Sequence, residues 1–366
     1  MFVRHDKEMK KKLWIGLTAI LLLSTAVAFY RYWTRTRQSS FDRSDVLAMV
    51  PADASAVIFV DLNELRSGSF FAKLYAWAPK PQADPDYEQF LKDTGFDYER
   101  DLSRIAIAFE KRGHDSAFFA VADGKFDRSK ITGVAMKNGT LSKTGAREIF
   151  SIPVSESANR VSFTFLRSDR IALTDDTDLA NLVAAKKHEA DSGDWPQRFE
   201  RLAGSPIFAV IRQDAAPGAA LAERTPGGIR SPQLSSLLDQ LQWITLAAKP
   251  EGDRLHVVAE GECIAEATSH QLADVLHGIV LLASEGLNDA KTRQQLDPAL
   301  RAAYLDLLKS ADVSKIDRGD TKSVRLAFEI TPAFLDAASR ARSALPGGAS
   351  PKPAPGNASR SKKGHT

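Results

Sequence analysis

The sequence predicts an α+β fold in which an N-terminal transmembrane helix is followed by two similar antiparallel-sheet-plus-helix units. Three observations support this prediction: a long uncharged apolar segment near the N-terminus, strand-like runs joined by short turns, and helix-like runs between them. Strands joined by short turns argue against a doubly wound parallel sheet. The 366 residues, 43% hydrophobic and 26% charged, suit two core-forming units.

The apolar segment spans residues 13–33, and residues 13–30 carry no charge. At about 1.5 Å per residue, this length matches the ~30 Å hydrocarbon core of a bilayer. Trp14 and Trp33 lie near its two ends, where aromatic rings favour the membrane interface. Five basic residues precede it in residues 1–12, and Arg31, Arg35 and Arg37 follow its uncharged part. The positive-inside rule therefore places the N-terminus in the cytoplasm and the body in the periplasm, as a single-pass inner-membrane protein.

Two other interpretations of this segment stay open. A cleaved signal peptide would combine the basic residues up to Lys12, the apolar stretch, and Ala26-Val27-Ala28 as its cleavage site. The mature chain would then begin Phe-Tyr-Arg-Tyr-Trp, an unusual start for a soluble protein, and for that reason we prefer the signal-anchor. A buried core helix is the third interpretation.

The body is predicted from the periodicity of its apolar residues, with strands rich in β-branched and aromatic residues. Strands are predicted over 55–61, 104–110, 117–123, 147–153, 160–167, 170–174, 205–214 and 324–330, and as a hairpin over 242–262 that turns at 250–253. Helices are predicted over 62–77, from Pro85, over 128–136 with Asp127 as cap, and over 178–188, 268–284, 298–310 and after Pro332.

The order of these elements indicates an internal duplication. Strand 55–61 with its following helix resembles 205–211 with its own, and hairpin 104–123 resembles hairpin 242–262. Whether the two units share one sheet is left open. The predicted organisation is a cytoplasmic basic segment 1–12, a transmembrane signal-anchor helix 13–33, a linker 34–45, a first α+β unit 46–200, a second unit 201–343, and a disordered basic tail 344–366.

Charge and cysteine content exclude several classes of function. Residues 38–343 hold 37 basic and 44 acidic residues, a net charge of −7, so we expect no binding of nucleic acid. Cys263 is the single cysteine, which excludes an internal disulfide and a CxxC-type zinc or redox site. A single cysteine also fits an oxidising compartment.

Clustered carboxylates at residues 175–178 are the first candidate site. Asp175-Asp176-Thr177-Asp178 offers the oxygens that Ca²⁺ or Mg²⁺ binds. The cluster also lies between a predicted strand and a predicted helix, where a carboxylate satisfies free backbone N–H groups. We therefore interpret it as a helix cap.

Histidines give no metal site by spacing. His270 and His277 are seven residues apart, whereas zinc pairs on a helix come four apart. His188-Glu189 begins a HExxH pattern, but position 192 is Ser. Arg318-Gly319-Asp320 is interpreted as the tip of a hairpin between 313–317 and 322–328. We predict no catalytic, cofactor-binding or metal-ligating residues and no cofactor.

A dense aromatic cluster lies early in the body, and its default interpretation is hydrophobic core. A pocket lined by some of its rings would instead hold an apolar ligand. The cluster comprises Phe70, Phe71, Tyr75, Trp77, Tyr87 and Phe90.

Two stretches carry a resemblance to known proteins. VPADASAVIFVDLNEL (residues 50–65) and RIALTDDTDLANLV (residues 170–183), together with the anchor-plus-body layout, resemble a group of uncharacterised bacterial membrane-anchored envelope proteins. This resemblance implies an exported α+β domain without assigned activity, and it transfers no functional residues.

The sequence therefore predicts a membrane-anchored envelope protein, attached through its N-terminal helix, whose body is a non-enzymatic interaction or scaffolding module for an envelope partner. The alternative is a binder or carrier of lipid or another apolar ligand. A further alternative is a hydrolase with dispersed catalytic residues. The absence of any catalytic motif favours the first two over an enzyme.

Overall fold

The computed structural model describes seven segments of the chain. They are residues 43–77, 85–112, 115–153, 160–176, 179–184, 194–213 and 232–344. The predicted cytoplasmic segment 1–12, signal-anchor helix 13–33 and tail after residue 344 lie outside them. Within the described segments, no helix is both long enough and apolar enough to cross a bilayer.

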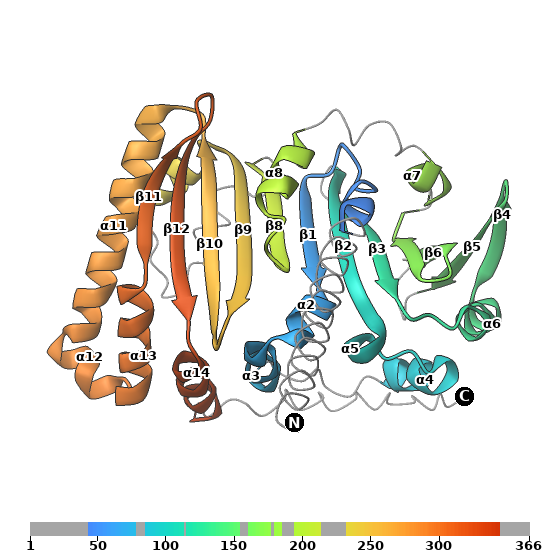
Figure 1. The fold of residues 1–366 in the computed structure, drawn as a ribbon, viewed down its shortest axis with the longest axis horizontal. Coiled ribbons are helices and arrows are strands. Elements are labelled where there is room, and N and C mark those ends of the chain that lie inside the picture. The colour runs from blue at the N-terminus through green and yellow to red at the C-terminus, as the bar shows by residue number, and fades with distance from the viewer. Residues whose placement is uncertain are drawn as a thin grey trace, which may run out of the picture. The chain divides into compact units, whose positions relative to one another are not determined.

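The twelve strands of the described residues form one antiparallel sheet, in the order β11-β12-β10-β9-β8-β1-β2-β3-β7-β6-β5-β4 (Figure 1). The α+β class is confirmed, and the question left open by the sequence is answered, because all twelve strands belong to a single sheet. The strands are β1 Ala56–Asp61, β2 Leu102–Arg112, β3 Asp115–Gly124, β4 Thr140–Thr144, β5 Arg147–Pro153, β6 Arg160–Arg167, β7 Arg170–Thr174, β8 Ile207–Arg212, β9 Leu241–Glu251, β10 Arg254–Cys263, β11 Asp312–Asp317 and β12 Lys322–Ile330.

Every strand run that was predicted from β-branched and aromatic residues is a strand in the structure. β4 was missed because its five residues, TLSKT, are polar but for one leucine and all exposed. Its position depends on Gly139, where a Cβ would lie 2.3 Å from the Ser151 carbonyl oxygen. Glycine therefore lets the chain pass directly from the preceding helix into β4.

The described parts of the predicted helices are helical, with 62–77 divided in two at Gly68, whereas the helices over 98–101, 195–201 and 290–295 were not predicted. The predicted cap of one helix is confirmed: the Asp127 carboxylate accepts a hydrogen bond from the Lys130 N–H. Residues 43–47, partly assigned to the linker, are also helical. The remaining helices are α2 Leu62–Ser67, α3 Ser69–Trp77, α4 Pro85–Thr94, α5 Tyr98–Asp101, α6 Arg128–Asn138, α7 Leu179–Ala184, α8 Trp195–Arg201, α10 Pro232–Leu238, α11 Glu266–Asn288, α12 Ala290–Gln295, α13 Pro298–Lys309 and α14 Pro332–Ala344.

The described residues divide into two compact units. The first unit consists of the chain up to Leu65 together with Pro81–Lys249. The second unit consists of Arg66–Lys80 together with the chain from Pro250. The predicted boundary between residues 200 and 201 falls inside the first unit. That residues 46–200 and 201–343 are separate folding units stays a prediction.

The core of the first unit lies on one face of its strands. Phe59 of β1 stacks on Phe208 of β8 at 5.0 Å between ring centres, and Phe199 of α8 lies against Phe208 at 5.9 Å. Trp195 of α8 meets Trp243 of β9 edge-to-face at 4.9 Å. These large rings, of which Phe199 and Trp243 are partly buried, hold α8 on the sheet.

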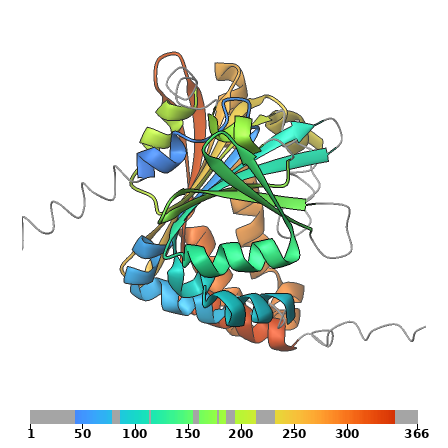
Figure 2. The ribbon, with the colours of Figure 1, turned by 90° about the vertical axis from the view of Figure 1, so that its right-hand side faces the viewer.

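A second cluster of the first unit lies where α6 packs against β4 and β5 (Figure 2). Ile131 and Ala135 of α6 contact Phe150 of β5 and Phe163 of β6, and those two phenylalanine rings stack at 5.2 Å. In the second unit, α11 packs on β10, β11 and β12, and α13 packs on α14. Leu300 and Ala303 of α13 contact Ala337 of α14 there.

Candidate functional site

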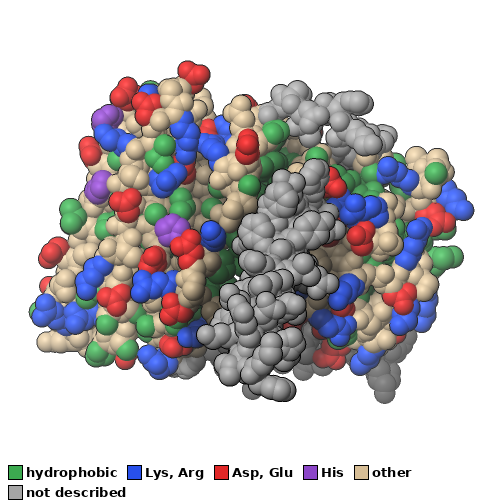
Figure 3. Space-filling view, viewed as in Figure 1, with side chains coloured by type: hydrophobic (Ala, Val, Ile, Leu, Met, Phe, Trp, Pro, Cys, Tyr) green, Lys and Arg blue, Asp and Glu red, His purple; other side chains and the backbone are tan. Residues whose placement is uncertain are grey.

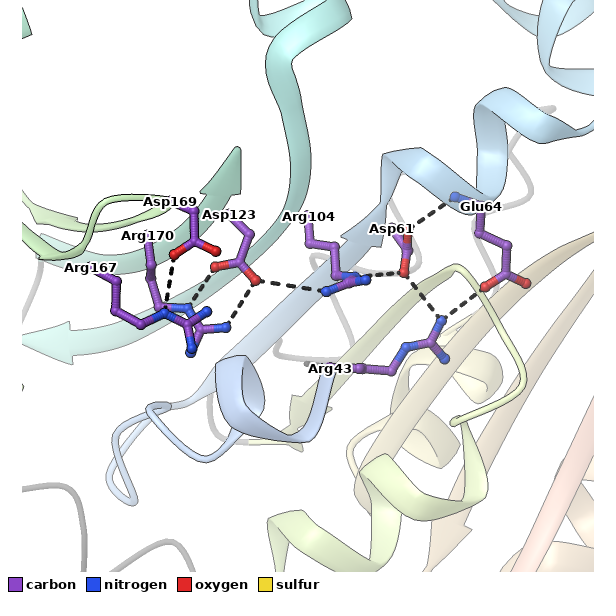
Figure 4. Close-up of polar contacts among 8 residues, drawn as sticks. All are labelled: Arg43, Asp61, Glu64, Arg104, Asp123, Arg167, Asp169 and Arg170. Atoms are coloured by element: carbon purple, nitrogen blue, oxygen red, sulfur yellow. Dashed lines mark hydrogen bonds and ion pairs between the residues drawn. The ribbon is translucent and has the colours of Figure 1, made fainter. Parts of the chain in front are cut away.

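Four charged side chains form a row across one end of the strands of the first unit (Figure 4). Asp61 ends β1, Arg104 lies near the start of β2, Asp123 lies near the end of β3, and Arg170 begins β7. Each residue is the direct cross-strand partner of the next. Because cross-strand partners share one face of a sheet, opposite charges alternate along a single line. We call these four residues the charged row.

The contacts within the charged row are short, and the four side chains are only 3–11% exposed. Arg104 Nε lies 3.0 Å from Asp61 Oδ2, and Arg104 Nη1 lies 3.8 Å from Asp123 Oδ2. Arg170 donates two hydrogen bonds to Asp123, from Nε to Oδ1 at 2.6 Å and from Nη2 to Oδ2 at 2.9 Å. This bidentate geometry is the strongest that a carboxylate makes with a guanidinium.

Arg43 extends the charged row toward the N-terminus of the described chain. Its Nη2 lies 3.0 Å from Glu64 Oε2 and 3.7 Å from Asp61 Oδ2. The same guanidinium donates to the Ala203 carbonyl oxygen and lies 5.2 Å from the centre of the Phe59 ring. The first described residue is thus held in the body by several contacts at once.

The charged row has a structural role, because its ion pairs join the ends of neighbouring strands. Burial by itself lowers the pKa of Arg170, but the hydrogen bonds and the charge of Asp123 raise that pKa overall, so the guanidinium stays charged. Both oxygens of Asp123 are engaged by arginines. A general acid or base must instead exchange a proton near neutral pH. The charged row therefore joins strand ends rather than supplying a proton carrier.

On the opposite face of the sheet, the surface formed by β9, β8, β1 and β2 is apolar and incompletely covered. Cross-strand register places three rows of four residues on β9, β8, β1 and β2. Ile58 at its centre is 36% exposed and Leu246 is 40% exposed, whereas Phe59, on the other face, is 0% exposed. The twelve residues of this apolar sheet face are Ala56, Ile58, Val60, Ile105, Ile107, Phe109, Ile207, Ala209, Ile211, Ile244, Leu246 and Ala248.

Of the carboxylates at residues 175–178 the structure describes Asp175 and Asp176, so the predicted helix cap stays a prediction. Asp175 Oδ1 accepts a hydrogen bond from the Phe118 N–H of β3 at 2.8 Å, so this carboxylate satisfies a strand rather than a helix. The Asp176 N–H donates a hydrogen bond to the Thr174 hydroxyl oxygen at 3.0 Å. Positions 177 and 178 lie outside the described residues. The signal missed here was the pairing of β3 with β7, which sequence spacing does not reveal.

The predicted histidines serve separate local contacts. His270 lies 2.9 Å from Lys315 Nζ and 3.7 Å from Glu266, whereas His277 Nδ1 lies 2.9 Å from the Ala273 carbonyl oxygen of its own helix. His188 lies outside the described residues. Among the described residues, no three His, Cys, Asp or Glu side chains gather as metal ligands.

Cys263 and the Arg318-Gly319-Asp320 tripeptide have structural surroundings. Burial raises the pKa of the Cys263 thiol to about 11, so the thiol is neutral at physiological pH. Gly319 has φ +76° at the turn between β11 and β12, which confirms the predicted hairpin tip. Arg318 points back to the Glu260 carboxylate and donates to both of its oxygens.

The aromatic cluster is divided between the two units. Phe70, in the second unit, is fully buried as predicted. Tyr87 of the first unit lies 5.2 Å from Tyr98, and Phe90 lies 6.3 Å from Phe96. The side chains of Tyr75 and Trp77 lie outside the described residues.

Comparison with known proteins gives a structural similarity at low sequence identity. No protein-family model matches the chain, and no curated protein matches it. Crystal forms III, IV and I of the Treponema pallidum protein TP0453 are similar in structure, with TM-scores of 0.42, 0.43 and 0.42 and sequence identities of 10, 12 and 12%. The similarity covers 80–81% of this chain and 96–98% of TP0453. A TM-score below 0.5 does not transfer a function.

Proposed function

We propose that this protein is a non-enzymatic module of a bacterial envelope, anchored in the inner membrane by residues 13–33, which binds the acyl chain of a lipid on its apolar sheet face. The observation that carries the proposal is the burial of β1. Residues 56–60 are all apolar, yet Val57 and Phe59 are 0% exposed and Ile58 between them is 36% exposed. An exposed contiguous apolar surface marks a binding site for apolar matter.

The composition of the apolar sheet face favours a lipid over a protein partner. Eleven of its twelve residues are aliphatic, and the twelfth is Phe109. Interfaces between proteins are centred on Tyr, Trp and Arg, which are missing from these twelve positions. Three rows on four strands cover about 14 by 14 Å, enough for an extended hydrocarbon chain. Each methylene buried there contributes about 0.8 kcal/mol.

The predicted anchor keeps the body near its proposed ligand. Residues 34–42 separate the apolar segment from Arg43, and nine residues reach at most about 30 Å. Arg43 is fixed to the body by Asp61, Glu64 and the Ala203 carbonyl. A body held this way stays within one bilayer thickness of the lipid surface.

The test is binding of a fluorescent fatty acid to the full-length protein in mild detergent. The variant Ile58→Thr/Leu246→Thr places a β-branched side chain, which strands favour, at both positions while it makes the centre of the apolar sheet face polar. The matched control, Leu281→Thr/Leu282→Thr, changes two leucines of α11 that are 67% and 73% exposed. We expect 10- to 100-fold weaker binding for the first variant and less than twofold change for the control.

Equal loss in both variants would assign the binding to general surface hydrophobicity and overturn the proposal. Saturable binding that neither variant changes would place the site elsewhere. Circular dichroism of both variants separates loss of binding from loss of fold.

We further propose that the body arose by internal duplication. Outward from the central pair β8 and β1, the sheet order is β9, β10, β12, β11 on one side and β2, β3, β7, β6 on the other. Each side thus continues with a hairpin and then with two strands in reversed chain order. This mirrored order supports the duplication suggested by the sequence. An experimental structure in which strands 56–174 and 207–330 fail to superpose would contradict it.

A further inference from the structure

We infer that β4 is a docking edge for an acidic, extended segment of another polypeptide, which would add to the sheet as a further strand. This inference goes beyond the lipid site and is independent of it. β4 ends the sheet order and pairs with β5 alone among the described strands. All five of its residues are exposed. An edge strand of this kind offers backbone N–H and C=O groups to an incoming strand.

The turn that follows β4 determines which backbone groups face outward. Gly145, with φ +61°, and Ala146 form a two-residue turn that joins Thr144 to its partner Arg147. In a two-residue hairpin, the pair that flanks the turn is hydrogen-bonded, and the pairs after it alternate, so that the first and the third of them are not hydrogen-bonded. The N–H and C=O groups of Leu141 and Lys143 therefore point away from β5. These residues provide the backbone contacts of the docking edge.

The surroundings of β4 are basic. The described residues between 127 and 160 hold six basic and two acidic side chains, a net charge of +4, and Figure 3 shows Lys and Arg side chains along this edge. Glu148 is shared by Arg128 at 3.3 Å and Lys143 at 3.9 Å. The basic residues are Arg128, Lys130, Lys137, Lys143, Arg147 and Arg160.

The positive charge around β4 favours an acidic partner strand. Lys143 and Arg147 lie on opposite faces of the β4–β5 hairpin, because Lys143 is paired with Glu148 and Arg147 with Thr144. An added strand with acids at successive positions would meet a cation on either face. A second copy of β4 would instead bring Lys143 near its own counterpart, and the basic tail 344–366 would be repelled as well. The partner is therefore acidic and foreign to this chain.

Exposed apolar atoms complete the docking edge. Leu141 is 39% exposed on β4, and Met136 is 61% exposed near the end of α6, the helix that leads into β4. Their exposure next to a free strand edge would be covered by an apolar side chain of the added strand. The expected partner sequence thus combines acidic residues with β-branched apolar ones.

The test uses the full-length protein in mild detergent and two labelled peptides of eight residues, one repeating Glu-Glu-Val-Val and the other Lys-Lys-Val-Val, so that charges lie on both faces of the added strand. Fluorescence anisotropy should show that the acidic peptide binds at least tenfold more tightly. Lys143→Glu/Arg147→Glu should weaken it at least tenfold. The charge-matched control Lys291→Glu/Lys309→Glu, on α12 and α13, should change binding less than twofold.

A third variant separates strand addition from simple charge attraction. Leu141→Pro keeps every charge but removes one outward N–H, and an edge strand tolerates proline at such a position. We expect a loss of at least fivefold with an unchanged melting temperature. Unchanged binding in Leu141→Pro, equal binding of both peptides, or equal effects of the two charge-reversed variants would each overturn the docking edge.

Discussion

Each of the two units contains an ion-pair cluster built on neighbouring strands, but the two clusters differ in burial. In the first unit, Asp123 of β3 faces Arg170 of β7, and their side chains are 9% and 5% exposed. In the second unit, Glu260 of β10 faces Arg325 of β12, whose side chain is 39% exposed. The Glu260 side chain is 8% exposed, so the two pairs differ in their arginines, which are desolvated in the first unit and accessible to water in the second. Because removing a partner from a desolvated pair leaves a charge that water cannot reach, the two clusters should respond differently to the same substitution.

The largest effect should come from Asp123→Ala. This change leaves Arg170 without its bidentate partner and removes one of the two carboxylates near Arg104. We expect a loss of about 3–5 kcal/mol in the free energy of unfolding. Denaturant unfolding of the full-length protein, followed by tryptophan fluorescence, measures it. Arg167→Ala is the control, because its pair with Asp169 at 3.1 Å is exposed on both sides and should contribute less than about 1 kcal/mol.

A loss below about 1 kcal/mol in Asp123→Ala would show that the end of the row opens to water in solution. The double variant Asp123→Ala/Arg170→Met sharpens the result. Its loss should be smaller than the sum of the two single losses, since the second change removes the charge that the first one leaves unpaired.

Glu260→Ala should have a smaller effect, about 1–2 kcal/mol. Its hydrogen bond to Arg318, which raises the pKa of that guanidinium, is lost, but Arg318 and Arg325 are partly exposed and regain water. Salt provides the contrast with Asp123→Ala. At 1 M NaCl the effect of Glu260→Ala should fall by half or more, while that of Asp123→Ala should change little, because buried pairs are screened less. An equal salt response in both variants would remove the distinction between the two clusters.

Sequence patterns predicted the strands of both clusters but not the clusters themselves. β1, β2, β3 and β7 each follow from a short run of β-branched and aromatic residues. The charges at their ends belong to positions 61, 104, 123 and 170, which are far apart in sequence. They meet because the order of strands in the sheet brings them into register, and that order follows from the packing of the whole unit. Long-range pairing of this kind leaves no mark in local spacing.

The apolar sheet face and β4 show the same limit in two other ways. Alternation in β1 was hidden because both of its faces are apolar, so periodicity gave no sign that one face is incompletely covered. β4 has almost no apolar residue and therefore no strand signal, yet the glycine turn and the paired β5 make it a strand. The regions proposed to bind are thus the regions where the pattern of polar and apolar residues is least informative.

The smallest expected effect concerns the pair of Arg100 with Asp101, in which the arginine side chain is 66% exposed and the carboxylate side chain 11% exposed. The Asp101 carboxylate accepts hydrogen bonds from Arg100 Nε at 2.9 Å and Nη2 at 2.7 Å, and from the Asp97 N–H at 3.0 Å. The hydrogen bonds from Arg100 are the main cause that lowers the Asp101 pKa from 3.8 to about 2. A lowered pKa in the folded state stabilises the fold above pH 3.8, and this contribution is lost as the pH falls through 2.

Asp101→Asn should therefore be less stable than the natural chain near pH 5, and the electrostatic part of that gap should close as the pH falls toward 2. Its size should stay below about 1 kcal/mol, because the Arg100 side chain is 66% exposed and the pair is screened by water. Urea unfolding of both proteins at intervals from pH 5 to 2 measures the gap, and Arg100→Ala should show the same closure. A gap that stays constant over this range would mean that Asp101 stabilises α5 through its shape and its backbone contacts rather than through its charge.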